Sequence, residues 1–260
     1  RGLPSVMATT SIHDTGTGRL TALVDATLLT ALRTGAASAV VTDILARSDA
    51  STLGLIGCGA QSVTQAHAIS RVRPIDTVVA YDADPLVSAS LCERLPIDVD
   101  VIIVEDARSV AEAADIICTA TTVDIGAGPV LAAEASLRPG VHINAVGADF
   151  PGKTELPVAL LSAALVIPDE VAQCLKEGES QQLTADQLGP DLPALVKDAE
   201  HFAGHREKLT VFDSTGWALE DLIAAEIALA HAKRLAIGLH ADLQHTPVDP
   251  YDPYELLNRR

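Results

Sequence analysis

A buried strand that runs into a glycine turn and then a helix is the part of this sequence that most directly predicts chemistry. Residues 53–56 are apolar, Gly57 and Gly59 follow them, and residues 63–71 have a helical pattern. Gly57 suits a tight turn, and Gly59 leaves room for the backbone to approach a pyrophosphate, which the helix amides would face. Ser62 replaces the third glycine of this fingerprint. The motif predicts a dinucleotide-binding site.

An acidic residue lies where such a site needs one. The strand predicted at 77–82 ends in Asp82, about 20 residues after the glycine turn. Its carboxylate there would accept hydrogen bonds from the adenosine ribose hydroxyls and would repel a 2′-phosphate, so we expect NAD rather than NADP. The alternative is a glycine turn and a surface aspartate in a fold that binds no nucleotide.

Two charged residues follow the strand predicted at 141–146. Asp149 and Lys153 lie beyond its carboxyl end, which is where ligands bind in parallel sheets. A carboxylate in hydrogen-bond reach of a reacting amine would hold and shuttle its proton during hydride transfer at a C–N or C–O centre. The alternative is that Asp149 caps a helix beginning near Pro151.

One arginine stands beside a threonine and a glycine in the helix predicted at 27–47. The guanidinium fork of Arg33 could hold a phosphate or a carboxylate with two hydrogen bonds. It could equally form a salt bridge between domains. The periodicity of the helix favours neither reading.

The rest of the pattern alternates strands with helices, which predicts an α/β fold with a Rossmann-type, doubly wound parallel sheet. Strands are expected at 53–56, 77–82, 99–104, 114–120, 141–146, 164–167 and 209–213, with short helices and loops over 169–208 and an amphipathic helix at 217–237. Residues 5–13 and 19–25 alternate around a turn and predict a β-hairpin. Because two strands alone are marginal, we expect further strands from residues upstream of Arg1.

Composition narrows the choice of partner and compartment. The 260 residues carry a net charge of −17 and are 48% hydrophobic, which disfavours nucleic acid and suits a cationic substrate, unless the charge serves solubility alone. The sequence has neither a run of about 18 apolar residues nor a basic leader, so we expect a cytoplasmic chain with no membrane contact. No zinc site, other metal site or disulfide is expected from the spacing of Cys58, Cys92, Cys118 and Cys174.

Five motifs in order resemble the ornithine cyclodeaminase/μ-crystallin family. They are Arg-Thr-Gly-Ala-Ala at 33–37, the glycine turn at 57–62, Tyr-Asp-Ala-Asp-Pro at 81–85, the stretch 144–149 with 152–156, and Phe-Asp-Ser-Thr-Gly at 212–216. Three stretches, 29–40, 142–157 and 177–190, especially resemble bacterial lysine cyclodeaminases. The resemblance implies an NAD-binding domain at 49–213 and a smaller α+β substrate and dimerisation domain, incomplete here, built from 1–48, 214–260 and upstream residues. A homodimer is expected.

The same resemblance implies an activity and a set of site residues. A tightly held NAD would be reduced and reoxidised in each turnover, so that L-lysine gives L-pipecolate and ammonia. Asp149 matches the catalytic acid/base, Arg33 contacts the substrate carboxylate or the cofactor, and Thr215 meets the substrate. The residues that fall where the family lines its cofactor are Ser5, Arg33, Thr34, Gly57, Gly59, Ala60, Gln61, Asp82, Thr122, Asn144, Ala145, Val146, Lys153 and Ser214.

Other functions stay open on the sequence alone. L-ornithine, which would give proline, differs from lysine by one methylene, and that difference is worth only about 1–3 kcal/mol in a pocket. The scaffold also suits an imine reductase or amino-acid dehydrogenase with net cofactor turnover. A non-catalytic NAD(P)-binding protein is the third alternative, which the presence of Asp149 and Lys153 disfavours.

Overall fold

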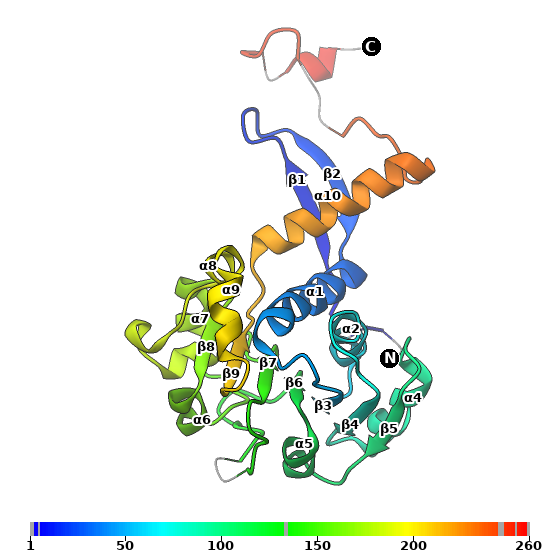
Figure 1. The fold of residues 1–260 in the computed structure, drawn as a ribbon. Coiled ribbons are helices and arrows are strands. Elements are labelled where there is room, and N and C mark those ends of the chain that lie inside the picture. Colours follow the sequence, from blue (N-terminus) through cyan, green and yellow to red (C-terminus); the bar gives the residue numbers. More distant parts are fainter. Residues whose placement is uncertain (1–2, 5, 133–134, 244–246, 253, 259–260) are drawn as a thin grey trace. The chain divides into compact units, whose positions relative to one another are not determined.

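The computed structural model describes residues 3–4, 6–132, 135–243, 247–252 and 254–258. It contains two compact units (Figure 1). The sheet unit comprises residues 31–220, and the hairpin unit comprises residues 1–30 and 221–260.

A parallel sheet of seven strands forms the sheet unit. In chain order the strands are β3 (Thr52–Ile56), β4 (Thr77–Tyr81), β5 (Asp100–Ile103), β6 (Ile116–Thr119), β7 (His142–Ala145), β8 (Leu165–Pro168) and β9 (Thr210–Asp213). Their order across the sheet is β5-β4-β3-β6-β7-β9-β8. Successive strands are added on one side of β3 as far as β5 and on its other side from β6 onward, so the strand order reverses between β3 and β6. In doubly wound sheets, ligands bind in the crevice at this switch point.

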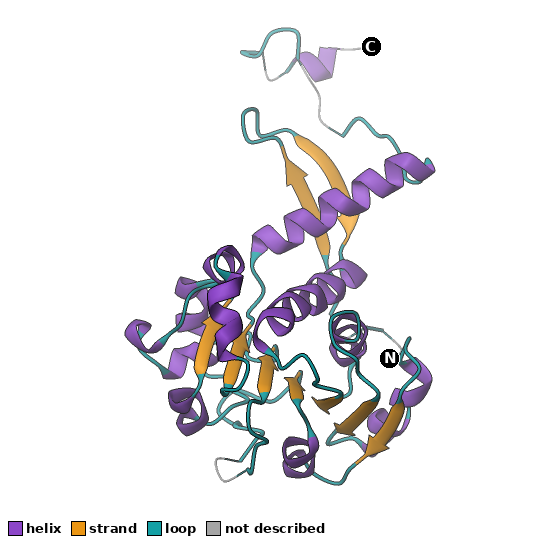
Figure 2. Cartoon of the chain, in the orientation of Figure 1, coloured by secondary structure: helices purple, strands orange, loops and turns teal. Residues whose placement is uncertain are grey.

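Helices cover both faces of this sheet (Figure 2). Apolar side chains from α1 (Thr27–Leu45) and α2 (Ala60–Ile69) pack on one face, and those from α5 (Ala107–Ala113) and α6 (Val158–Ala163) pack on the other. Alternate residues of each strand supply the two cores, as Leu55 and Ile56 of β3 do. The predicted Rossmann-type fold is confirmed.

Shorter helices fill the connections. They are α3 (Pro85–Ala89), α4 (Leu91–Arg94), α7 (Val171–Glu177), α8 (Leu192–Lys197), α9 (Ala199–Phe202) and the 3-10 turns η1 (Glu179–Gln182), η2 (Ala185–Gln187) and η3 (Ala203–His205). The sequence pattern indicated those after β8 but not α3 and α4. Asp84 starts α3, because its carboxylate accepts a hydrogen bond from the Leu86 amide at 2.9 Å.

The hairpin unit contains two antiparallel strands and most of a long helix. The strands are β1 (Thr9–His13) and β2 (Leu20–Asp25), and the helix is α10 (Ala218–Leu235); a single turn, η4 (Glu255–Asn258), follows near the end of the chain. The Asp14 carboxylate accepts a hydrogen bond from the Thr17 amide at 2.8 Å, and Gly18 has a φ of 72°. The predicted hairpin is confirmed, although its first strand begins at Thr9.

Helix α1 has the length and apolar composition of a membrane-spanning helix, and among the described residues it alone does. However, 56% of that stretch is buried inside the protein. Its Gly35 lies so close to α2 that a Cβ there would be 2.7 Å from the Thr64 carbonyl oxygen. Burial of this kind is that of a core helix.

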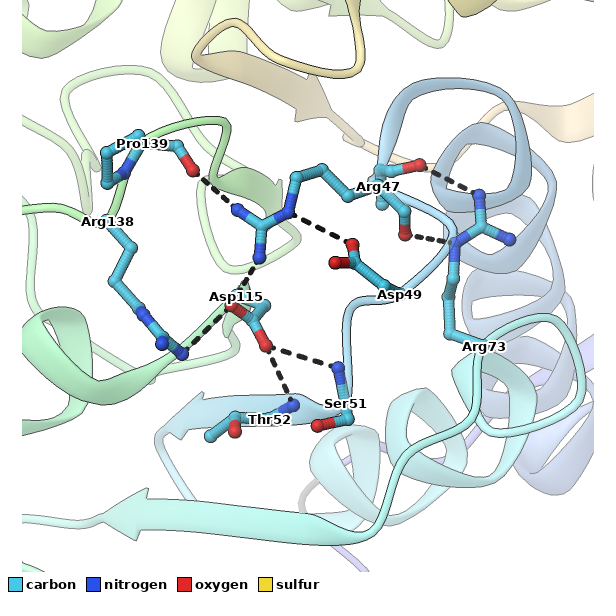
Figure 3. A network of polar contacts seen from close by, with 9 residues as sticks. Arg47, Asp49, Ser51, Thr52, Arg73, Asp115, Arg138 and Pro139 are labelled. Carbon is cyan, nitrogen blue, oxygen red and sulfur yellow. Dashed lines mark hydrogen bonds and ion pairs between the residues drawn. The ribbon is translucent and has the colours of Figure 1, made fainter.

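A carboxylate ties the amino-terminal edge of the sheet together (Figure 3). Asp115 accepts hydrogen bonds from the Ser51 and Thr52 amides at 3.1 Å and pairs with Arg47 at 2.7 Å and Arg138 at 2.9 Å. Burial opposes ionisation, but these donors together hold the pKa of Asp115 below its usual value. This network lies at the edge opposite the glycine turn.

Arg73 caps the carboxyl end of α1. Its guanidinium donates to the carbonyl oxygens of Thr42, Asp43, Ala46 and Arg47 at 2.8–3.0 Å, and it pairs with the Asp43 carboxylate at 2.8 Å. Its side chain is 4% exposed. The guanidinium therefore adds hydrogen bonds to carbonyl groups at the end of the helix, and its positive charge opposes the negative end of the helix dipole.

His142 is a buried histidine of strand β7, which α1 crosses. His142 Nδ1 is 2.8 Å from the Thr210 hydroxyl and Nε2 is 3.3 Å from the Asn144 side-chain oxygen. The Asn144 side-chain nitrogen in turn donates to the Thr42 hydroxyl of α1 at 3.0 Å. Burial lowers the pKa of His142 from 6.5 to about 3, so the ring is neutral in the folded protein.

This histidine predicts a loss of stability in acid. The unfolded chain binds a proton at residue 142 below about pH 6.5 and the folded chain does not, so stability falls as the pH falls. The loss is about 1.4 kcal/mol per pH unit, or about 2–3 kcal/mol between pH 6.5 and 4.5. Denaturant titrations at several pH values measure the free energy of unfolding. Between pH 6.5 and 4.5 it should fall by about 2–3 kcal/mol more in the unmodified chain than in His142→Gln. His67→Asn, a change at an exposed position of α2, should show the same fall as the unmodified chain. If His142→Gln also showed the same fall, His142 would not be the group responsible.

Candidate active site

The glycine turn after β3 leaves open space at the start of α2. Gly57 has a φ of 88°, and a Cβ there would lie 2.6 Å from the Ala120 carbonyl oxygen, so the turn packs tightly against the end of β6. Gly59, by contrast, has no neighbouring atom within 4 Å of the position of a Cβ, and it precedes α2 without a side-chain cap. The Ser62 hydroxyl donates to the Gly57 carbonyl oxygen. These features fit a pyrophosphate above the first turn of α2, beside the predicted residues Ala60 and Gln61.

Asp82 lies immediately after β4 and contacts this turn. Its two carboxylate oxygens accept hydrogen bonds from the Cys58 amide at 2.7 Å and the Asp84 amide at 2.9 Å. Arg94 of α4 donates to the Cys58 carbonyl oxygen at 2.8 Å. The predicted ribose-binding carboxylate is thus held at the edge of the glycine turn, where an adenosine ribose would lie.

The ends of β6 and β7 carry the next predicted residues. Thr122 is exposed, Val146 is half-buried, and Ala145 is buried. The Asn144 side chain is directed into the core toward Thr42, so a contact between Asn144 and a cofactor would have to come from its backbone.

Asp149 and Lys153 form an ion pair beyond β7. The Lys153 Nζ is 2.8 Å from the Asp149 Oδ1, and the side chains are 14% and 58% exposed, respectively. Asp149 caps no helix, because the following helix α6 begins only at Val158. The carboxylate is therefore open to solvent on one side and oriented by an ammonium group on the other.

Arg33 pairs with an acid of the same unit. Its Nη1 is 3.3 Å from the Glu220 Oε2, and the two side chains are 14% and 12% exposed. A Cβ at Gly216 would lie 2.6 Å from the Arg33 Nη2 and would displace the guanidinium, and the φ of 91° at this position also favours glycine. The alternative expected from the sequence was a salt bridge between domains, whereas this one joins two residues of the sheet unit. It keeps a guanidinium beside the loop that follows β9.

That loop carries the remaining predicted residues. Ser214 is buried, and its hydroxyl has no hydrogen-bond partner among the described residues. Thr215 donates to the Asp169 carboxylate at 3.1 Å, and Thr34 of α1 is buried. An unpaired buried hydroxyl at the carboxyl edge of the sheet fits a polar ligand there. Ser5 lies outside the described residues.

Sequence reasoning missed three buried carboxylates beneath these loops. Glu155, Glu179 and Asp213 are each fully buried. Burial raises the pKa of Glu155, raises that of Glu179 to about 9 and raises that of Asp213 to about 6. Asp213 ends β9, so the strand-end rule that selected Asp82 could have found it; Glu155 and Glu179 have no such signal. No group of three potential metal ligands occurs in the described ranges.

Together these groups can bind a dinucleotide and move a proton. The glycine turn and Asp82 lie at β3 and β4, and Asp149 with Lys153 lies beyond β7 across the switch point. A ligand held over the turn would extend toward β6 and β7. An exposed carboxylate at that end suits acid/base chemistry on a bound amine.

Comparisons with known proteins agree with this arrangement. The family model described as "Ornithine cyclodeaminase/mu-crystallin family" matches residues 1–234. An L-lysine cyclodeaminase from Streptomyces rapamycinicus is 44% identical over 98% of this chain and 74% of its own length.

Two solved structures have the same fold. One concerns recognition of L-lysine, L-ornithine and L-2,4-diaminobutyric acid by lysine cyclodeaminase; it is 51% identical with a TM-score of 0.94 and covers 98% of this chain and 74% of that one. The other, a dimer of an archaeal alanine dehydrogenase with bound NAD, is 32% identical with a TM-score of 0.80 over 94% and 77% of the two chains. This chain is a member of the ornithine cyclodeaminase/mu-crystallin family.

Proposed function

We propose that this protein is an NAD-dependent cyclodeaminase that converts L-lysine to L-pipecolate and ammonia. The observation that carries the proposal is the Asp149–Lys153 pair at the same sheet edge as an open glycine turn and Asp82. The similarity to lysine cyclodeaminases supports lysine as the substrate. Bound NAD would accept and return a hydride within one turnover, so the reaction has no net redox change.

Asp149 would perform the proton transfers. Its exposed carboxylate would take a proton from the side-chain ammonium of lysine, which frees that nitrogen to attack the α-carbon once the α-carbon has given up its hydride and become an imine carbon. It would then return a proton to the departing ammonia. Lys153, at 2.8 Å, orients this carboxylate and offsets its charge when no substrate is bound. A cationic amino acid suits an anionic group in this position.

Arg33 would hold the substrate carboxylate or the cofactor. Glu220 fixes the guanidinium at one end, and the absent side chain at Gly216 leaves it room. Thr215 would face the substrate from the neighbouring loop, and Asp169 orients its hydroxyl. Of the cofactor residues predicted from the family, Thr34 belongs to α1, and Thr122, Val146 and Ser214 belong to the segments that follow β6, β7 and β9.

The product assay separates this function from its alternatives. The protein should be incubated with L-lysine, and separately with L-ornithine, using catalytic amounts of NAD. We expect ammonia and pipecolate in equal amounts from lysine, faster than ammonia and proline from ornithine, without accumulation of NADH. Accumulating NADH without a ring product would instead identify a dehydrogenase, and bound NAD without turnover would identify a binding protein.

Asp82 should govern cofactor choice. Asp82→Asn is expected to weaken NAD binding about tenfold and to narrow the preference for NAD over NADP, because a charged hydrogen-bond acceptor contributes about 1.5–3 kcal/mol. Titration calorimetry with both nucleotides measures this. Asp84→Asn is the matched control: it removes a carboxylate that bonds to Leu86 in α3, and NAD affinity should stay within about twofold. Unchanged nucleotide preference in Asp82→Asn would show that this carboxylate does not meet the ribose.

The assembly and compartment are part of the same proposal. We infer a homodimer, since the archaeal alanine dehydrogenase of the same fold is a dimer. We also infer that the protein is cytoplasmic. Size-exclusion chromatography with light scattering measures the assembly directly.

A further inference from the structure

The Glu155 carboxylate joins the loops that follow two neighbouring strands. Its Oε1 accepts hydrogen bonds from the amide and the hydroxyl of Thr121, both at 2.7 Å. Its Oε2 accepts from the Thr119 hydroxyl at 2.6 Å and the Gly147 amide at 2.9 Å. A Cβ at Gly147 would overlap this carboxylate. One side chain therefore holds the end of β6 to the end of β7.

Glu155 is itself held in place. Its own amide and that of Leu156 donate to the side-chain oxygens of Glu179 at 2.6 and 3.1 Å. Its carbonyl oxygen accepts from the Val130 and Leu131 amides at 2.9 and 3.2 Å. The side chain has no solvent exposure. It also lies two residues after Lys153, so the same short segment carries the ion pair with Asp149.

The two loops lie on one side of the glycine turn. The sheet runs β4-β3-β6-β7, so Asp82 lies on the β4 side of the turn and the loops joined by Glu155 lie on the β6 and β7 side. A dinucleotide with its pyrophosphate over the turn and its adenosine at Asp82 must place its other half over β6 and β7. Glu155 therefore holds the loops on the nicotinamide side of the turn.

We propose that Glu155 is a positioning residue that sets the spacing of the loops at 119–122 and 145–147 for the nicotinamide half of the cofactor. This inference rests on the NAD binding in the proposed function. Glu155 touches neither substrate nor cofactor; it acts through the Thr121 and Gly147 backbone. A buried carboxylate costs desolvation energy that an apolar side chain would not, which is consistent with a role beyond packing.

Glu155→Gln should release one of the two loops. Glutamine has the same shape, but its NH₂ group can only donate. If the NH₂ replaces Oε1 it faces the Thr121 amide, and if it replaces Oε2 it faces the Gly147 amide. Threonine hydroxyls can rotate to accept from the NH₂, whereas a backbone N–H cannot. Either orientation leaves a buried amide facing another donor.

The test compares two ligands that share the adenosine half. Calorimetry should give Kd values for NADH and for ADP-ribose with the unmodified protein and with Glu155→Gln. We expect the Kd for NADH to rise at least about tenfold, since small displacements of positioning groups have large effects, and the Kd for ADP-ribose to stay within about twofold. Equal changes for both ligands, or no change for either, would overturn the proposal.

Two further variants keep the test decisive. Asp115→Asn removes a buried carboxylate at the opposite edge of the sheet; it should lower Tm without changing the ratio of the two Kd values. Thr119→Val removes one hydroxyl donor, and if Glu155→Gln fails to fold, it should raise the Kd for NADH alone by about threefold. If the unmodified protein does not turn over lysine, the proposed function is refuted. The proposal for Glu155 depends only on how the ratio of the Kd for NADH to the Kd for ADP-ribose changes in the variants.

Discussion

An Asp149→Asn variant is expected to have a kcat about 10³-fold lower with L-lysine. General acid/base catalysis contributes about 10²–10⁴-fold, and an asparagine side chain cannot act as the base. The substitution keeps the size of a side chain that is 58% exposed, so the fold should be unaffected. NAD affinity should stay within about threefold, since the glycine turn and Asp82 lie on the other side of the switch point. Initial rates of ammonia release measure kcat, and calorimetry measures NAD binding.

The matched control for this variant is Asp100→Asn. Asp100 is an exposed aspartate at the start of the edge strand β5, away from the carboxyl edge of the sheet. The Asp100→Asn substitution removes the same charge and should change kcat by less than about twofold. If Asp149→Asn retained more than a tenth of the activity, Asp149 would not be the acid/base group.

An Arg73→Met variant should have the largest effect on stability. Methionine fills much of the same space but leaves four carbonyl oxygens at the end of α1 and the Asp43 carboxylate without this partner. The Asp43 side chain is 62% exposed, so the loss comes from the carbonyl oxygens. Leaving a buried acceptor without its hydrogen bond costs about 1–3 kcal/mol, and several acceptors lose a donor here, so we expect a loss of about 3–5 kcal/mol. Urea denaturation followed by circular dichroism measures the free energy of unfolding.

Arg71→Met controls for the loss of charge. Arg71 lies two residues earlier and is exposed, and surface substitutions of this kind stay within about 0.5 kcal/mol. A loss below about 1 kcal/mol in Arg73→Met would mean that the carbonyl groups of α1 find other partners, and the capping role would be wrong.

The sheet could be predicted because each strand has a strong local signal. Residues 53–56 and 77–81 are short, largely apolar runs next to glycine or aspartate, and both are strands in the structure. The turn at Gly57 and the position of Asp82 follow from the same strand ends. The small helices α3 and α4 were missed because four or five residues are too few to show helical periodicity.

The contacts within the site could not be predicted, because their partners are distant in sequence. Arg33 pairs with Glu220, which is 187 residues away in the sequence. The sequence left an ion pair and ligand binding by Arg33 as equal alternatives. Asn144 was placed at the cofactor, yet its side chain bonds to Thr42, because α1 crosses the sheet there. The insertion of β9 between β7 and β8 also has no local signal.

Deuterium transfer tests the central claim most directly. L-Lysine labelled with deuterium at the α-carbon should be converted with catalytic unlabelled NAD, and the pipecolate analysed by mass spectrometry. The proposed function predicts that pipecolate keeps the deuterium at its α-carbon, while ammonia forms in equal amount and no NADH accumulates. Pipecolate without deuterium, or deuterium accumulating in free NADH, would contradict internal return of the hydride and with it the cyclodeaminase.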